Sequence, residues 1–157
     1  MNGRVIAILK GNPRRSRAII KQCIDGVIFR EIDHSPTLKR LLDAFPDAKR
    51  KVLQVHVCWA ETEAQALEIA YDQWRTNVFP PPLCWDLATV EQFDIAATHV
   101  RPEDLQGAVL ISADLARHVA WIEELAALGF DAIYLHHVGQ EQRRFIDTFG
   151  EHVLPAL

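Results

Sequence analysis

The stretch Lys51-Val52-Leu53-Gln54-Val55-His56-Val57-Cys58-Trp59 decides the fold class of this 157-residue chain. Its side chains alternate between two sets, as they do on the two faces of a β-strand: Leu53, Val55 and Val57, and Gln54, His56 and Cys58. Thr62 and Gln65 follow at the spacing of a capping box, which predicts that a helix begins there. The stretch is therefore a strand followed directly by a helix.

The same order of strand and helix recurs on both sides of this stretch. Short apolar runs predict further strands, and helix-start signals or apolar positions at helical spacing predict the helices between them. The strands are expected at residues 4–9, 26–29 and 132–137, and the helices after Asn12-Pro13, after Ser35-Pro36, at 113–128 before Gly129, and at 140–149 with Phe145, Ile146 and Phe149 buried. Alternating strands and helices favour parallel pairing with right-handed crossovers, so the predicted class is α/β.

Residues 77–107 interrupt this repeat. The segment contains Pro80-Pro81-Pro82 and a predicted helix at residues 89–98, and a short strand at 108–112 follows it. We expect Ser112 to cap the next helix. We interpret residues 77–107 as an insertion or lid within a single domain that spans residues 1–157.

The composition excludes several classes of protein. The formal net charge is -4, so the chain lacks the basic field that nucleic-acid binding needs. The apolar run at residues 5–9 is too short for a signal peptide or a membrane span, which favours a cytoplasmic protein. Three dispersed cysteines indicate reduced, buried thiols, with Cys58 and Cys84 left open as catalytic candidates. The sequence contains no motif typical of a metal site, so we expect none.

Several segments resemble the luciferase-like monooxygenase superfamily, which also contains the coenzyme F420-dependent dehydrogenases. They are Ile28, residues 52–60 with the ending Trp59-Ala60, and residues 139–145, which read Gly-Gln-Glu-Gln-Arg-Arg-Phe. Residues 72–82 resemble the branch of non-F420 flavin oxidoreductases. The resemblance implies a partial (β/α)8 TIM barrel containing strands five to eight, at residues 5–9, 27–29, 52–58 and 133–137. A full barrel takes about 250 residues, so about four strand-helix units fit here.

The resemblance also implies where a cofactor would lie. The turn Lys10, Gly11, Asn12 and Pro13 occupies the place of the family's flavin-phosphate turn, and Arg14 adds positive charge. The free N–H groups of a helix N-terminus favour an anion, and Gly11 allows close approach. The alternative is an ordinary capped helix with a solvated basic face. FMN is the expected cofactor, and coenzyme F420 is the alternative.

Five residues are candidates for a substrate pocket: His56, Cys58, Trp59, Trp85 and His137. The first three lie at the end of the best predicted strand, where barrel enzymes bind their ligands. His137 ends the last strand beside His136, and only one of two adjacent strand residues can face a pocket. Trp85 belongs to an apolar part of the insertion that suits a hydrophobic substrate wall, or that simply packs a lid. Arg143 and Arg144 are expected on a solvated helix face, with contact to a phosphate or a second subunit as the alternative.

Two functions therefore compete at the level of sequence. The first is a truncated or split luciferase-like flavin-dependent oxidoreductase or monooxygenase that is inactive alone. The second is a non-catalytic half-barrel that serves as a binding or assembly module, because a half-barrel exposes a sheet edge and an apolar face. The expected partners are a second copy of the chain or a separate first half-barrel. A gene with an altered start, encoding a longer protein, is a third possibility.

Overall fold

The computed structural model describes residues 6–9, 26–29, 35–44, 46, 50–80 and 82–157. The chain forms two compact units. The first comprises residues 1–55 and 120–136, and the second comprises residues 56–119 and 137–157. Strand β3 (Lys51–Cys58), helix α6 (Leu115–Ala126) and strand β5 (Ala132–His137) each contribute residues to both units.

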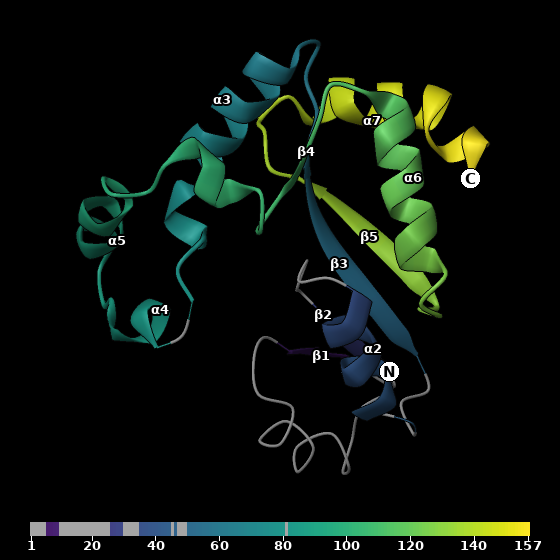
Figure 1. The fold of residues 1–157 in the computed structure, drawn as a ribbon, viewed down its shortest axis with the longest axis horizontal. Coiled ribbons are helices and arrows are strands. Elements are labelled where there is room, and N and C mark those ends of the chain that lie inside the picture. Colours follow the sequence, from purple (N-terminus) through teal and green to yellow (C-terminus); the bar gives the residue numbers. More distant parts are fainter. Residues whose placement is uncertain (1–5, 10–25, 30–34, 45, 47–49, 81) are drawn as a thin grey trace, which may run out of the picture. The chain divides into compact units, whose positions relative to one another are not determined.

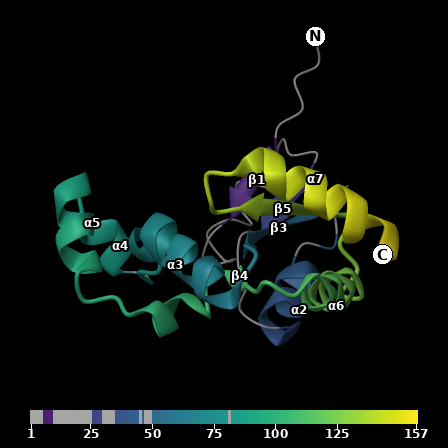
Figure 2. The ribbon, with the colours of Figure 1, turned by 90° about the horizontal axis from the view of Figure 1, so that it is seen from above.

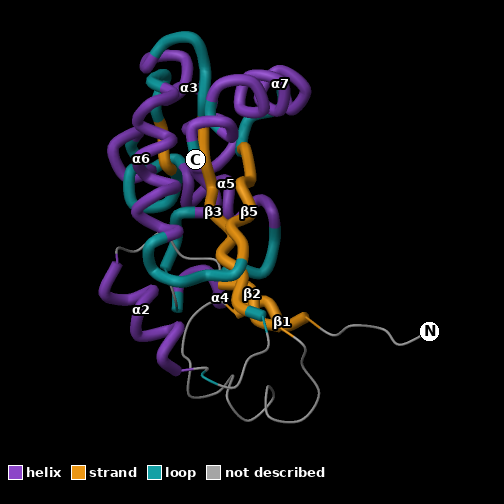
Figure 3. Tube along the Cα trace, turned by 90° about the vertical axis from the view of Figure 1, so that its right-hand side faces the viewer, coloured by secondary structure: helices purple, strands orange, loops and turns teal. Residues whose placement is uncertain are grey.

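Parallel strands organise the first unit. Strand β1 (Ile6–Leu9) pairs in parallel with β2 (Gly26–Phe29), in a register that runs from Ile6 opposite Gly26 to Leu9 opposite Phe29. Strand β2 pairs in parallel with the start of β3, with Val27 opposite Lys51. Figure 3 shows β1 and β2 side by side. The α/β class and the parallel pairing predicted from the alternating segments are confirmed for these strands.

Strand β5 pairs with β3 on the other side. Asp131, just before β5, makes two hydrogen bonds to Lys51: its backbone N–H donates to the Lys51 carbonyl at 2.9 Å, and its carboxylate accepts from the Lys51 N–H at 2.6 Å. This double link fixes where the two strands start to pair. Helix α2 (Ser35–Ala44) belongs to the same unit and buries Leu38 and Leu42, one helical turn apart.

The second unit is built around the end of β3. Strand β4 (Leu110–Ile111) pairs in parallel with it, placing Leu110 opposite Val57 and Ile111 opposite Cys58. Helix α3 (Glu63–Trp74) follows β3, and the Thr62 hydroxyl accepts a hydrogen bond from the Gln65 N–H at 3.2 Å. That contact is the cap expected from the sequence. A small apolar core closes the unit, made of Cys58, Ala70, Leu105, Val109 and Val138.

The predicted insertion folds into short helical pieces in the second unit. They are the 3-10 turn η1 (Arg75–Asn77), helix α4 (Leu83–Asp86), helix α5 (Val90–Ala97) and the 3-10 turn η2 (Pro102–Leu105). Helices α4 and α5 lie next to each other in two perpendicular views (Figures 1 and 2). The helix expected at residues 89–98 is confirmed. Helix α4 and the 3-10 turns could not be predicted from the sequence, because short helices lack a full apolar period.

Two local expectations are wrong. Ser112 was expected to cap α6, but the Ala116 N–H donates to the Asp114 carboxylate at 2.9 Å, so Asp114 is the cap. Ser112 is instead fully buried, and its hydroxyl donates a hydrogen bond to the Glu63 carboxylate. Ile146 was expected in the core, but its side chain is 62% exposed. Helix α7 (Gln142–His152) turns only Phe145 and Phe149 into the core, at the four-residue spacing of one stripe.

Helices α6 and α7 end in different ways. Gly129 follows α6 with a φ of 91°, a left-handed conformation that glycine adopts without strain and that ends the helix as predicted. The 3-10 turn η3 (Leu154–Ala156) follows α7. Among the described residues, no helix has both the length and the apolar character that crossing a bilayer requires.

Candidate functional site

A cavity of about 510 Å³ lies in the second unit, where β3 and β5 end. One wall is the segment after β3, another is α3, and a third is the loop between β5 and α7. The lining residues are Trp59, Ala60, Glu61, Gln65, Glu68, Ile69, Asp72, Gln73, His137, Gly139, Gln140, Glu141 and Arg144. The carboxyl ends of parallel strands are the usual place for ligands in α/β proteins. The volume of the cavity also falls in the range typical of small-molecule sites.

His137 is held rigidly at the base of this cavity. Its side chain is only 4% exposed, and its ring stacks on Phe145 with centroids 4.5 Å apart and planes 5° from parallel. Gly139 also lies close to the His137 ring. A Cβ added at position 139 would lie 2.6 Å from His137 Nε2 and 3.0 Å from Ile69 Cγ2. Glycine is therefore required at 139 for the loop to pass the imidazole.

Hydrogen bonds fix the loop that follows His137. The Val138 N–H donates to the Val57 carbonyl at 2.9 Å, which ties the loop to β3. The Gln142 side chain donates to the carbonyls of His137, at 3.0 Å, and Gly139. Gln140 Nε2 donates to Gln73 Oε1 at 3.2 Å and so joins the loop to α3. The two walls are thus bonded to each other.

Trp59 and Arg144 form the side of the cavity near the end of β3. The Trp59 indole N–H donates to the Ala113 carbonyl at 3.2 Å, which fixes the ring. The Arg144 guanidinium lies 5.9 Å from the centre of that ring and pairs with the carboxylate of Glu61. The one guanidinium in the cavity lining is therefore already engaged by a carboxylate and an aromatic face.

The cavity is strongly acidic. Its lining holds four carboxylates, Glu61, Glu68, Asp72 and Glu141, and one guanidinium, Arg144, which gives a formal charge of -3. An adjoining hollow of about 520 Å³ shares Glu68 and Asp72 and adds Asp94 and Arg75. There Arg75 pairs with Asp72 at 3.4 Å. Phosphate and carboxylate ligands would be repelled by this field.

A hydrogen-bond network of the exposed Glu63 with the buried Ser112 and His118 supports the starts of α3 and α6. Glu63 Oε1 accepts from the Ser112 hydroxyl at 2.6 Å and from the Ala113 N–H at 3.0 Å. The hydrogen bond from Ser112, above all, lowers the pKa of Glu63. His118 Nε2 lies 3.0 Å from the Ser112 carbonyl oxygen, and burial lowers the pKa of His118. The network orients backbone rather than lining the cavity.

The structure brings two of the five predicted pocket residues together, because Trp59 and His137 both line the cavity. His56, Cys58 and Trp85 do not line it. His56 is 8% exposed and its ring lies 4.6 Å from that of Trp74. Trp85 is 67% exposed on α4.

Cys58 lies in the apolar core, and burial raises the pKa of its thiol to about 12. A thiol with so high a pKa stays protonated at neutral pH and is a poor nucleophile. The predicted phosphate turn, Lys10, Gly11, Asn12, Pro13 and Arg14, lies outside the described residues. In the part of the chain that the structure describes, no group of three or more His, Cys, Asp or Glu side chains is placed to hold a metal.

Sequence reasoning missed the acidic lining and Gly139. Glu68 and Asp72 are four residues apart in the predicted α3 helix, a spacing that puts both on one face. The acidic wall that α3 contributes to the cavity could therefore have been predicted from this spacing. The need for glycine at 139 had no sequence signal, because it arises from how the folded loop passes the His137 ring and Ile69.

The fold and the cavity together define an α/β protein with a parallel sheet and a ligand site at the strand ends. The solved structures that share this fold include the following three. An F420-dependent secondary alcohol dehydrogenase in complex with an F420–acetone adduct matches with a TM-score of 0.72 and 13% identity, over 96% of this chain and 47% of that chain. The coenzyme F420-dependent tetrahydromethanopterin reductase from Methanopyrus kandleri matches at 0.69 and 14%, over 96% and 50%. Apo-MsnO8 matches at 0.59 and 15%, over 99% and 52%.

At these identities the matches establish the fold, and at that level they confirm the resemblance that the sequence indicated. The chain spans about half the length of the first two structures. The sequence itself matches no protein-family model and no curated protein.

Proposed function

We propose that this chain forms the second half of a luciferase-like (β/α)8 barrel, and that its cavity is part of the active site of a flavin- or F420-dependent oxidoreductase. Strands β1, β2, β3 and β5 are then strands five to eight, and residues 77–107 are an insertion within one domain. The observation that carries the proposal is the cavity at the carboxyl ends of β3 and β5, in a fold shared with F420-dependent enzymes over 96% of the chain.

The cavity suits the ring system of such a cofactor better than its phosphate. Trp59, Ala60 and Ile69 give it aromatic and apolar wall, which suits an uncharged ring system. The surrounding carboxylates do not suit a phosphate, so we place the phosphate at the basic turn from Lys10 to Arg14. FMN is the first candidate and F420 the second. When bound, either would supply hydride transfer.

The residues of this chain would bind, orient and shield. His137 offers an imidazole whose position is fixed by Phe145 and Gly139. Trp59 offers a ring edge and face whose orientation is fixed by its bond to Ala113. The hydrogen bond between Gln140 and Gln73 would hold the loop against α3 while a ligand is bound. Rigid side chains of this kind lose little entropy when a ligand binds.

Titration of the purified protein with FMN and with F420 tests the proposal. Binding is followed by the quenching of cofactor fluorescence, and we expect near-stoichiometric uptake of one of them. Trp59→Ala should weaken binding by about tenfold, because stacking of a ring on an aromatic side chain is worth about 1–1.5 kcal/mol. Gly139→Ala should weaken it as well, because the new methyl group pushes His137 and Ile69 from their positions.

Trp85→Ala is the matched control, because it removes the same side chain from an exposed position outside the cavity. It should bind like the wild type. The proposal fails if neither cofactor is taken up, or if Trp85→Ala and Trp59→Ala lose the same affinity.

A second candidate function is a non-catalytic half-barrel that assembles with a second copy or with a separate first half-barrel. One observation favours it: the insertion exposes large apolar side chains, namely Leu83 at 43%, Trp85 at 67%, Val90 at 73% and Ile95 at 67%. Exposed apolar patches often mark interaction surfaces. A colourless protein that sediments as a dimer, and that becomes monomeric with Trp85→Ser and Ile95→Ser together, would favour this function over the first.

A further inference from the structure

We propose that the cavity takes an organic cation, a protonated amine or a quaternary ammonium group, and rejects anionic ligands. This inference rests on the proposed function, because it names the class of substrate for the same site. The binding site is the cavity itself, and the side chains that line it set the charge of what can enter.

The first argument is the balance of charge. Four carboxylates line the cavity against one guanidinium. Arg144 does not offer its charge to an anion, because it pairs with Glu61 and lies over the Trp59 ring. In the adjoining hollow Arg75 is likewise paired with Asp72, and it also donates to the Asp72 carbonyl at 2.7 Å. Both cations are engaged, so an incoming anion would meet a negative field.

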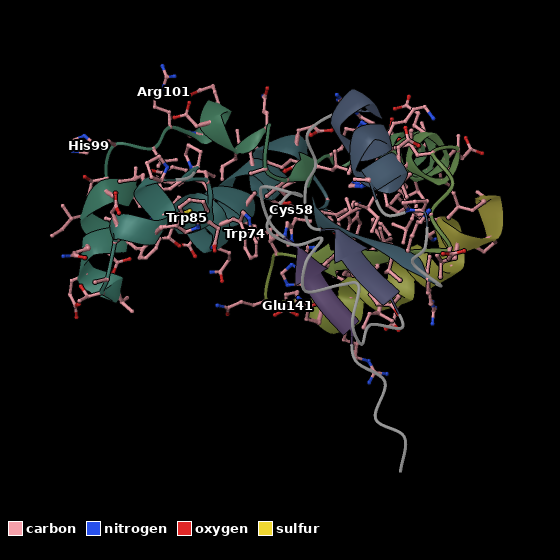
Figure 4. All side chains as sticks on the ribbon, turned by 90° about the horizontal axis from the view of Figure 1, so that it is seen from below. Cys58, Trp74, Trp85, His99, Arg101 and Glu141 are labelled. Atoms are coloured by element: carbon pink, nitrogen blue, oxygen red, sulfur yellow. The ribbon has the colours of Figure 1, made fainter. Side chains whose placement is uncertain are left out.

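The second argument concerns the carboxylates that are left over. Within the described part of the chain, no ion pair involves Glu68 or Glu141. Glu68 projects from α3 and Glu141 stands at the start of α7, so the two carboxylates lie on different walls of the same cavity. Figure 4 places Glu141 on the loop before α7. A positive group between these walls would gain attraction from both.

The third argument is the chemistry of the walls between the carboxylates. Trp59, Ala60 and Ile69 are aromatic or apolar, and aromatic faces with nearby carboxylates are the usual recognition elements for ammonium groups. A bare metal ion is a poorer fit, because hard cations need several oxygen ligands converging on one point. Here no three acidic or His side chains among the described residues converge in this way. An organic cation can instead fill the apolar space and reach the carboxylates.

Binding of two small aromatic probes of opposite charge tests the proposal. The cation is benzyltrimethylammonium and the anion is phenylphosphonate, and each is titrated against the full chain by calorimetry in 50 mM salt. We expect the cation to bind, and we expect an excess of the anion to leave the cation's affinity unchanged, because the anion does not enter the cavity. Raising the salt about tenfold should weaken the cation's binding, because exposed charges are screened.

Variants locate the effect. Glu68→Gln and Glu141→Gln should each weaken benzyltrimethylammonium by about fivefold, and the double variant by about twentyfold, the size expected of single charges about 4 Å away in water. Glu124→Gln is the control: it removes the same charge from an exposed position on α6 that lines neither cavity. It should leave the affinity unchanged.

The inference is overturned if phenylphosphonate displaces the cation, if the cation does not bind, or if Glu124→Gln weakens the cation as much as Glu68→Gln does. Its failure is distinguishable from failure of the proposed function, which is read from uptake of FMN or F420. Cofactor uptake without cation binding would leave the oxidoreductase proposal in place and remove only the substrate class.

Discussion

Helices α5 and α7 differ in a way that separates local sequence signals from packing. Helix α5 has a complete capping box, in which the Thr89 hydroxyl accepts from the Gln92 N–H at 3.3 Å and Gln92 bonds back to the Thr89 N–H, also at 3.3 Å. It nevertheless leaves Val90 and Ile95 exposed. Helix α7 has no side-chain cap, yet it buries Phe145 and Phe149. A good start signal forms a helix, and burial alone decides how much that helix stabilises the fold.

The largest expected effect comes from removing the buried ring of α7. Phe149 is 3% exposed, with its ring 4.1 Å from that of Phe145 and 5.1 Å from that of His118. Phe149→Ala should lower the free energy of unfolding by about 3–5 kcal/mol, because it opens a cavity among these rings. Urea denaturation followed by tryptophan fluorescence measures the change.

The matched variant on the other helix is Ile95→Ala, which trims a side chain that is 67% exposed. It should change the free energy of unfolding by no more than about 0.5 kcal/mol. Equal losses of unfolding free energy in Phe149→Ala and Ile95→Ala would show that α5 packs as tightly as α7, which would contradict the difference described between the two helices.

An intermediate effect on the free energy of unfolding is expected when the pH is lowered, because His118 and Glu63 then take up protons. Burial holds the pKa of His118 below its ordinary value, so the unfolded chain takes up this proton first. Its contribution to stability is complete above about pH 6.5 and is lost as the pH falls below that value. The pKa of Glu63 is lowered by the hydrogen bond from Ser112, so its contribution is lost in a second window, below about pH 4.3.

Ser112→Ala removes the donor to Glu63. It should cost about 1–2 kcal/mol at neutral pH, and it should flatten the loss of stability in the lower window only. His118→Gln should flatten the upper window. The midpoint of urea unfolding, measured for each variant from about pH 2 to about pH 8 so that both windows are covered, checks both. A Ser112→Ala profile parallel to the wild type would contradict the role given to this bond.

The smallest expected effect lies in α5. Thr89→Ala deletes one half of the capping box and should cost this helix about 1 kcal/mol. Because α5 buries only Ala97, we expect the loss to remain local. Amide hydrogen exchange should speed up in residues 90–97, while the global unfolding midpoint moves little. A shift of the global midpoint as large as that of Ser112→Ala would mean that α5 is coupled to the core.

Much of the fold could be predicted from local chemistry. The limits of β2 and β5 agree with the apolar runs at 26–29 and 132–137, because a short apolar run is a local signal for a strand. The caps at Thr62 and Thr89 were also readable, since a cap depends on residues three positions apart. Ser112 was misassigned because its hydroxyl is drawn to Glu63, which lies 49 positions away and gives no local signal.

The candidate site was predictable only in part. Trp59 and His137 follow from their place at strand ends, where chain direction alone puts them near a pocket. Strand alternation could not tell that His56 would pack against Trp74, or that Cys58 would join an apolar core, because both depend on which helix covers which face. The acidic lining comes from three separate segments and needed the tertiary fold to become visible.

The close passage of Gly139 over His137 determines how this cavity could be redesigned. Any larger residue at 139 meets the imidazole and Ile69, so libraries that diversify this loop would mostly yield damaged proteins. Glu68, on α3, also lines the cavity, and it is not among the nearest neighbours of a Cβ at position 139. Engineering of ligand preference should therefore begin on the helix and leave the loop as it is.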